Sequence, residues 1–225
     1  MIIRDYTDME VKLLWHTPEP KKVLKLACGT TMLNDPEYGG EVNARLIKYL
    51  IEADHTKVFE HICMGLQVTG ISRSLLQQNI THRHWSCTSS SQHYQDYSEM
   101  PLVCDRAAWP ITEFERATAS SFVYYNRAIS TFEIAKEEAR QVLPSACMVN
   151  QVITTNYRNL ITFFKLRLCY RNVLEMQVFA DVLRTTCMEQ FPEFMSVIGP
   201  QCFMDRCRQG KMKCRTEKWI PGNLL

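Results

Sequence analysis

The chain has 225 residues, of which 46% are hydrophobic and 22% are charged. This length and balance are typical of one large or two small folded domains with a buried core, and they exclude a disordered chain. The formal net charge is only +2, so the composition lacks the strong positive field of proteins that bind nucleic acid polymers. We therefore expect no nucleic acid polymer as a partner.

The ten cysteines are scattered along the chain and form no Cys-x-x-Cys pair. The first residues lack the apolar stretch of a secretory signal, and the longest apolar runs are too short to cross a bilayer. We therefore expect reduced thiols, a cytoplasmic protein and no membrane partner.

Hydrophobic spacing and turn residues predict the elements of the first part of the chain. In chain order they are a strand over 11–15, a helix that opens at the Pro18-Glu19-Pro20 turn, a loop over 34–40, an amphipathic helix over 42–53, a strand over 62–68 that ends at Gly70, and a short helix over 72–79.

The second part of the chain is predicted to be mostly helical. Its elements are a long helix over about 113–142 that Leu143-Pro144 stops, a strand over 148–155, helices over 156–168 and 172–191, and a basic, loop-like tail from residue 200. Long helices mixed with a few separated strands predict a mixed α+β fold in one domain.

Residues 81–94, Thr-His-Arg-His-Trp-Ser-Cys-Thr-Ser-Ser-Ser-Gln-His-Tyr, are rich in side chains that donate hydrogen bonds. Several of them can carry a positive charge. Such a stretch suits an anionic ligand with many hydrogen-bond acceptors, such as a nucleotide phosphate. A polar surface loop with a chance cluster of histidines is the simpler alternative.

The same stretch resembles the signature of the flavin-dependent thymidylate synthases, which reads Arg-His-Arg, seven residues, then Ser. Here Thr81-His82-Arg83 is followed by seven residues and then Ser91. Other segments in the same order also resemble the family: 11–18, His55 to His61 (His-x-Ser-x-x-Glu-His), Gly70 to Arg73 (Gly-Val-Ser-Arg), Ala139 to Pro144 (Ala-Arg-x-x-Leu-Pro), and the run from Asn156 to Leu168 (Asn-x-Arg-x-Leu…Phe…Leu-Arg).

The resemblance implies a single domain over 1–225 with a basic tail over 201–225. Its fold would be α+β, with a central, mostly antiparallel sheet flanked by long helices. It also implies an FAD-dependent methyltransferase that converts dUMP to dTMP. Methylenetetrahydrofolate would supply the carbon and NADPH the reducing hydride, and the enzyme would be a homotetramer with shared active sites.

Site residues follow from the same resemblance. Arg167 is the implied catalytic residue. The implied flavin contacts are Lys57, Thr81, His82, Arg83, Ser89, Asn156, Tyr157, Arg158 and Thr162. The implied nucleotide contacts are Gln78, Asn79, Ile80, Thr81, Ser89, Ser90, Ser91, Gln92, His93, Arg140 and Arg167.

The chemistry of these residue types agrees with those roles. C5 of uracil becomes nucleophilic only if negative charge on the ring is stabilised, and an Arg in an apolar helix, as at Arg167, can do this without giving up a proton. A solvated Arg on the surface of the helix is the alternative for Arg167, although an Arg in an apolar run is more often a site residue or part of a buried ion pair. Arg140 suits phosphate, although it could instead be a cation that faces a helix C-terminus.

The chain departs from the family pattern at two positions of the nucleotide site. Thr81 replaces the first Arg of the signature, and His93 replaces an Arg that follows the Ser. These changes predict weaker phosphate binding, because an Arg is always charged and a His is not. They also leave open a related C5 modification such as hydroxymethylation, dCMP as the substrate, or a weakened nucleotide-binding relative.

Two other kinds of site are less favoured by the sequence. Ser91 has no identifiable base to activate it as a nucleophile, so we assign it to binding. His82, His84 and His93 match no common zinc spacing, and neither does the run Cys202-x4-Cys207-x6-Cys214, so no metal site is predicted.

Overall fold

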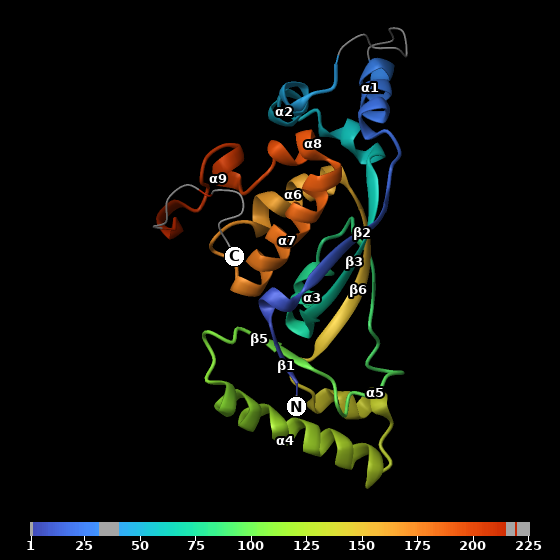
Figure 1. The fold of residues 1–225 in the computed structure, drawn as a ribbon, viewed down its shortest axis with the longest axis vertical. Coiled ribbons are helices and arrows are strands. Elements are labelled where there is room, and N and C mark those ends of the chain that lie inside the picture. Colours follow the sequence, from blue (N-terminus) through green and yellow to red (C-terminus); the bar gives the residue numbers. More distant parts are fainter. Residues whose placement is uncertain (1, 32–40, 215–218, 220–225) are drawn as a thin grey trace. The chain divides into compact units, whose positions relative to one another are not determined.

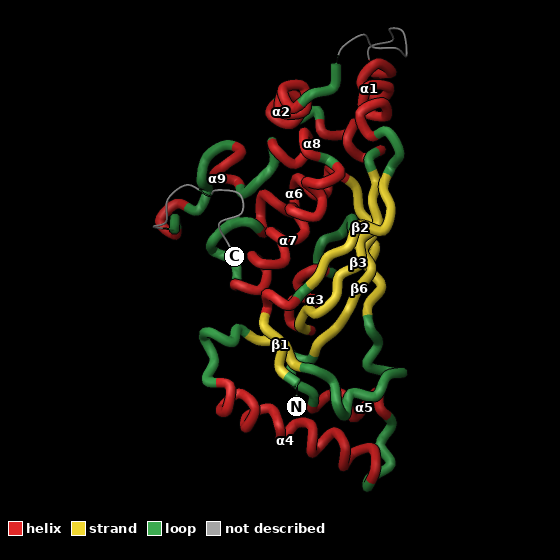
Figure 2. Tube along the Cα trace, viewed as in Figure 1, coloured by secondary structure: helices red, strands yellow, loops and turns green. Residues whose placement is uncertain are grey.

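The computed structural model of the protein describes residues 2–31, 41–214 and 219. The described strands form a four-stranded sheet and a separate two-stranded sheet, and helices of different lengths accompany them (Figures 1 and 2). The chain divides into two compact units. Unit 1 comprises residues 1–10, 67–83 and 87–152, and unit 2 comprises residues 11–66, 84–86 and 153–225. The single domain over 1–225 stays a prediction.

The four-stranded sheet has the strand order β2-β3-β6-β4. The strands are β2 (Glu10–His16), β3 (Cys63–Ser72), β6 (Met148–Asn156) and β4 (Ser86–Ser89). Just after the end of β3, Arg73 N donates to the O of Cys147, which directly precedes β6, at 2.9 Å. Just after the end of β6, Tyr157 N donates to the O of Ile62, which directly precedes β3, at 2.8 Å. Residue numbers rise on one strand as they fall on the other, so the pairing is antiparallel. The mixed α/β class with a mostly antiparallel sheet is confirmed.

Strand β6 shows why this part of the sequence is extended. Its side chains alternate between buried and exposed along the strand, with Val149 and Ile153 buried and Asn150 and Val152 exposed. Successive side chains of a strand point to opposite faces, and β-branched residues suit such a half-buried surface. Polar side chains on the exposed face, such as Asn150, are therefore available for other contacts.

Unit 2 contains most of the helices. They are α1 (Pro20–Thr31), α2 (Ala44–Glu52), the 3-10 helix η2 (Thr56–His61), α6 (Tyr157–Arg167), α7 (Leu174–Gln190), α8 (Pro192–Ser196), α9 (Gln201–Met204) and the 3-10 helix η4 (Gly210–Met212). Helices α6 and α7 pack side by side (Figure 1). The rings of Phe163 and Phe179 join them, with centroids 5.8 Å apart.

Unit 1 has its own core. Strand β1 (Ile3–Asp5) pairs in parallel with β5 (Leu102–Cys104), and Asp5 caps the 3-10 helix η1 (Tyr6–Asp8). The helical elements are α3 (Arg73–Asn79), α4 (Ile111–Ser130), α5 (Lys136–Ala139) and the 3-10 helix η3 (Arg140–Val142). Phe114, Phe122 and Tyr125 of α4 are buried in one cluster with Tyr97 and Leu102.

Three predictions for the elements were wrong. The strand does not end at Gly70, because β3 continues to Ser72. The helix over 113–142 is divided, because α4 ends at Ser130 and Glu133 has a φ of 51°, which a continuous right-handed helix cannot contain. The tail is not wholly loop-like, since α9 and η4 lie within it.

The other predicted elements are confirmed to within two residues, except the loop over 34–40, which lies outside the described residues. Strands β1, β4 and β5, of three or four residues each, were not predicted. All ten cysteines are free thiols. None of the helices in the described parts of the chain is long and apolar enough to cross a membrane.

Gly70, inside β3, has a positive φ and leaves no room for a side chain, so we predict that Gly70→Ala destabilises the protein. Its φ is +77°, and an added Cβ would lie 3.3 Å from both Asp8 O and Met9 Cα. The left-handed backbone alone costs an alanine about 1–2 kcal/mol, and backbone atoms cannot rotate away from the new methyl group. Thermal unfolding should show a melting temperature lower by roughly 2–8 °C.

Gly210→Ala is the matched control. Gly210 also has a positive φ, +53°, but an added Cβ there would meet nothing within 4 Å. A Gly70→Ala variant as stable as Gly210→Ala would contradict the role of crowding beside Gly70.

Candidate functional site

The serine-rich turn after β4 is fixed to β6 by Asn150, and both belong to unit 1. Ser90 N donates to Asn150 O at 2.9 Å, and Asn150 N donates to Ser90 Oγ at 3.1 Å. The side-chain oxygen of Asn150 accepts from Gly70 N at 3.1 Å. The hydroxyl of Ser90, a predicted nucleotide contact, therefore already holds the fold together. These bonds fix the point at which the turn with Ser91 and Gln92 leaves β4, which ends at Ser89.

The first residues of the stretch 81–94 form hydrogen bonds to the C-terminal end of α3. Ile80 is the C-cap residue, Thr81 Oγ1 donates to Gln78 O at 2.7 Å, and His82 N donates to Asn79 O at 3.1 Å. Asn79 is fully buried, and neither polar atom of its amide has a partner among the described residues. Such an orphaned amide is costly unless water or a ligand satisfies it. Gln78 and His82 are half-buried, whereas Thr81 and Arg83 are exposed.

His93 and Arg140, the predicted phosphate-binding residues, both contact Glu137. His93 Nδ1 is 2.6 Å from Glu137 Oε2, and Arg140 Nε donates to the main-chain carbonyl of Glu137 at 2.9 Å. Ser91 Oγ accepts from His93 N at 3.1 Å, so this hydroxyl shapes the turn. The structure thus brings His93 and Arg140 to one place within unit 1.

The first turn of α6, in unit 2, carries several predicted flavin contacts. Asn156 caps the helix by accepting from Asn159 N at 3.0 Å. Arg158 is exposed and forms an ion pair with Glu60 of η2, and Thr162 lies one turn further along. Tyr157 points into the core, where its hydroxyl donates to Phe194 O and burial raises its pKa well above the usual value.

Arg167 is the last residue of α6 and is half-buried. Burial lowers the pKa of its guanidinium. The helix end is fixed by Asn172, whose side-chain amide donates to Leu166 O at 2.7 Å, to Cys169 O at 3.0 Å and to Arg167 O at 3.2 Å. A cation in a partly apolar, fixed setting is suited to stabilise negative charge on a bound ring.

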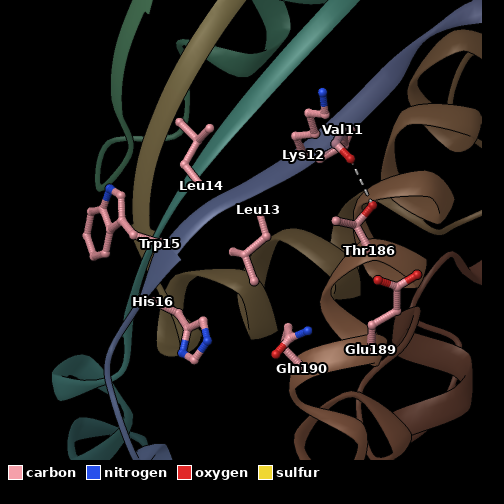
Figure 3. A pocket seen from close by; sticks show the side chains of 9 residues that line it. All are labelled: Val11, Lys12, Leu13, Leu14, Trp15, His16, Thr186, Glu189 and Gln190. Atoms are coloured by element: carbon pink, nitrogen blue, oxygen red, sulfur yellow. Dashed lines mark hydrogen bonds between the residues drawn. The ribbon is translucent and has the colours of Figure 1, made fainter.

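Two cavities of unit 2 differ in their relation to the predicted residues. Lys57 lines a cavity of about 360 Å³ whose other walls include Cys28, Leu46 and Leu50. A cavity of about 450 Å³ lies between β2 and the end of α7, where Thr186 Oγ1 donates to Val11 O at 3.2 Å (Figure 3). None of the predicted site residues lines this second cavity.

Thiols gather at a third cavity of unit 2, of about 490 Å³, which Cys169, Cys202, Cys207 and Cys214 line. Burial and the neighbouring thiols raise the pKa of Cys202. Among the described residues, no group of three or more His, Cys, Asp or Glu side chains is placed to hold a metal ion.

The sequence did not predict the residues that hold the predicted binding residues in place. Glu137 contacts His93, Glu60 pairs with Arg158, and Asn172 fixes the turn beside Arg167. Glu60 lies within a segment that resembles the family, which was a usable signal. Glu137 and His93 are too far apart in the sequence for any periodicity to relate them.

Comparison with known proteins gives a family match. The family model described as "Thymidylate synthase complementing protein" matches residues 12–193. A flavin-dependent thymidylate synthase of Nitratidesulfovibrio vulgaris is 31% identical over 218 residues, which cover 87% of this chain and 89% of that protein. The enzyme of the same name from Clostridium tetani is 28% identical, with 92% and 93% covered.

Solved structures share the fold. The UMP/dUMP methylase PolB from Streptomyces cacaoi, bound with 5-Br dUMP, has a TM-score of 0.73 at 24% identity and covers 87% of this chain and 96% of its own. Thymidylate Synthase X from Helicobacter pylori, with FAD and dUMP, has a TM-score of 0.69 at 20% identity and covers 83% and 97%. With the family model matched from β2 to α8, the chain belongs to the family of the flavin-dependent thymidylate synthases.

Proposed function

We propose that the protein transfers a one-carbon unit to C5 of dUMP and reduces it to a methyl group. Methylenetetrahydrofolate supplies the carbon, NADPH supplies a hydride, and the products are dTMP, tetrahydrofolate and NADP⁺. The family match over residues 12–193 carries this proposal. The half-buried Arg167 at the end of α6 supports it from the structure.

The donor set of the chain fits FAD, which would relay the hydride from NADPH. FAD carries a pyrophosphate, and an exposed guanidinium group, such as that of Arg83 in unit 1 or of Arg158 in unit 2, is suited to bind phosphate. Lys57, His82 and Asn156 offer further polar groups. The remaining proposed contacts are Thr81, Ser89, Thr162 and Tyr157, whose side-chain hydroxyl is already used in the core.

On the substrate, each proposed residue has a separate task. Arg167 binds the uracil ring and stabilises negative charge at N3 and the carbonyl oxygens, which makes C5 nucleophilic. Arg140 and His93 bind the phosphate. The remaining proposed nucleotide contacts, which hold and orient dUMP, are Gln78, Asn79, Ile80, Thr81, Ser89, Ser90, Ser91 and Gln92.

A change of substrate or product is the second candidate function, because Thr81 and His93 depart from the family pattern. The structural neighbour PolB, described as a UMP/dUMP methylase, fits this alternative. Incubation with dUMP, UMP or dCMP, followed by mass spectrometry of the nucleotide, separates the candidates, since a methyl and a hydroxymethyl product differ in mass. A clear preference for dCMP would overturn dUMP methylation.

We also propose a cytoplasmic homotetramer with shared active sites. Ten free thiols support the reducing compartment. Exposed large apolar side chains on β2, Leu14 and Trp15, at 50% and 48% exposure, support burial against another subunit. Light scattering of the purified protein would measure the subunit number.

We predict that the purified protein contains FAD without a covalent link, because the proposed contacts are polar and ionic. Denaturation should release the flavin into the filtrate, where its visible absorption identifies it. A colourless protein that FAD cannot reconstitute would contradict the prediction and favour a weakened relative.

We predict that Arg167→Ala lowers nucleotide turnover by roughly two to three orders of magnitude, because one preorganised cationic donor is lost. Reduction of the flavin by NADPH should persist, since Arg167 acts on the pyrimidine. Stopped-flow absorbance and product assays measure the two steps separately.

Arg171→Ala is the matched control, because Arg171 is exposed in the turn after α6 and is not a proposed contact. Turnover by Arg167→Ala at the level of this control would refute the role of Arg167.

A further inference from the structure

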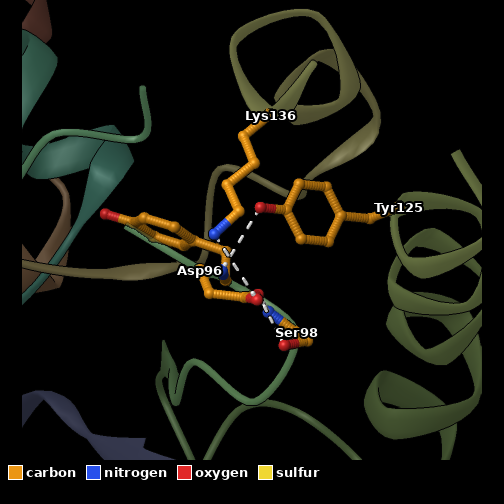
Figure 4. Close-up of polar contacts among 5 residues, drawn as sticks. Asp96, Ser98, Tyr125 and Lys136 are labelled. Atoms are coloured by element: carbon orange, nitrogen blue, oxygen red, sulfur yellow. Dashed lines mark hydrogen bonds and ion pairs between the residues drawn. The ribbon is translucent and has the colours of Figure 1, made fainter. Parts of the chain in front are cut away.

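Two contacts with acidic side chains join the segment after β4 to α5 within unit 1. The first is His93–Glu137, and in the second Lys136 Nζ lies 3.7 Å from Asp96 Oδ2. Figure 4 shows the second pair, in which Ser98 N also donates to Asp96 Oδ1 at 2.8 Å and Tyr125 lies close by. Residues 93–98 are thereby fixed to the start of α5, and His93 is held beside a carboxylate.

Glu137 differs from the acidic residue that follows it. The side chain of Glu137 contacts His93, and its carbonyl accepts from Arg140, so it touches both proposed phosphate ligands. Glu138 instead accepts from Gln141 Nε2 at 2.7 Å. The carboxylate of Glu137 therefore lies beside a residue to which the proposed function assigns the phosphate.

We propose that Glu137 sets the selectivity for phosphate at this site, because its carboxylate competes with the nucleotide phosphate for His93. The inference rests on the proposed function. Nδ1 is the ring nitrogen of His93 beside Glu137, so the carboxylate and the phosphate compete for the N–H at this atom. A phosphate that takes this donor must displace the carboxylate and then lie close to a like charge.

Exposure keeps this competition reversible. The side chains of His93 and Glu137 are 42% and 44% exposed, and exposed ion pairs are weak. Phosphate can thus displace the Glu137 carboxylate from His93, but His93 then contributes less to the affinity for phosphate than it would without Glu137. In wild-type protein the preference for dUMP over deoxyuridine, which has no phosphate, is therefore smaller than Arg140 and His93 alone would give.

Glu137→Gln tests the competition, because glutamine keeps the shape and can still accept from the ring while it removes the charge. The dissociation constants of dUMP and deoxyuridine would be measured by titration of the flavin spectrum of the holoenzyme. We expect dUMP to bind roughly three- to tenfold more tightly to the variant and deoxyuridine to bind as before. Added salt should reduce the difference.

Glu138→Gln is the control and should leave both constants unchanged. Unchanged or weaker dUMP binding in Glu137→Gln overturns the proposal, and so does equal tightening of dUMP and deoxyuridine. The wild-type titration reports separately on the proposed function. If wild-type holoenzyme binds no dUMP, the proposed function and the role of Glu137 both fail, whereas wild-type binding with an unshifted variant overturns Glu137 alone.

Discussion

Asn150 is the residue on which the geometry of the proposed nucleotide contacts after β4 depends. Its side-chain oxygen accepts from Gly70 N, and its main-chain N–H and carbonyl bond to Ser90. One exposed position of β6 therefore connects β3 and the turn after β4. Because Gly70 adopts a positive φ, a side-chain acceptor satisfies an N–H that lies within an otherwise extended strand. The bonds of Asn150 to Gly70 and to Ser90 therefore determine where the serine-rich turn lies.

Two of the residues proposed for anion binding share one arrangement, which is an exposed contact with a carboxylate. Arg158 pairs with Glu60 in unit 2, and His93 pairs with Glu137 in unit 1. Exposed pairs contribute at most about 1 kcal/mol, so a phosphate or pyrophosphate can replace the carboxylate at little cost. These contacts orient the side chains of Arg158 and His93 and still allow a phosphate to replace the carboxylate. Arg167 differs, because it is half-buried at a helix end that Asn172 fixes.

Local signals in the sequence were enough for the elements that carry the site. Ser72 and Asn156 are polar caps directly before helical runs, and both helices begin there. The wrong or missed predictions concern elements and contacts that depend on residues far away in the sequence. Gly70 is a turn signal that strand pairing overrides, and the positive φ of Glu133 divides a helix that periodicity favours. The pairs His93–Glu137 and Arg158–Glu60 join segments far apart in the chain, so no spacing rule could find them.

The two departures from the family pattern, Thr81 and His93, both fall among the proposed nucleotide contacts. The hydroxyl of Thr81 donates to Gln78 O, so its proton is used to close α3, and a phosphate oxygen, which only accepts, gains little from it. His93 is shared with Glu137, which leaves Arg140 as the proposed phosphate ligand with a permanent charge. The group proposed for the ring, Arg167, matches the family. A loss confined to the phosphate side should weaken substrate binding far more than the chemical step, because Arg167 would stabilise negative charge at N3 and the carbonyl oxygens whether or not the phosphate is held tightly.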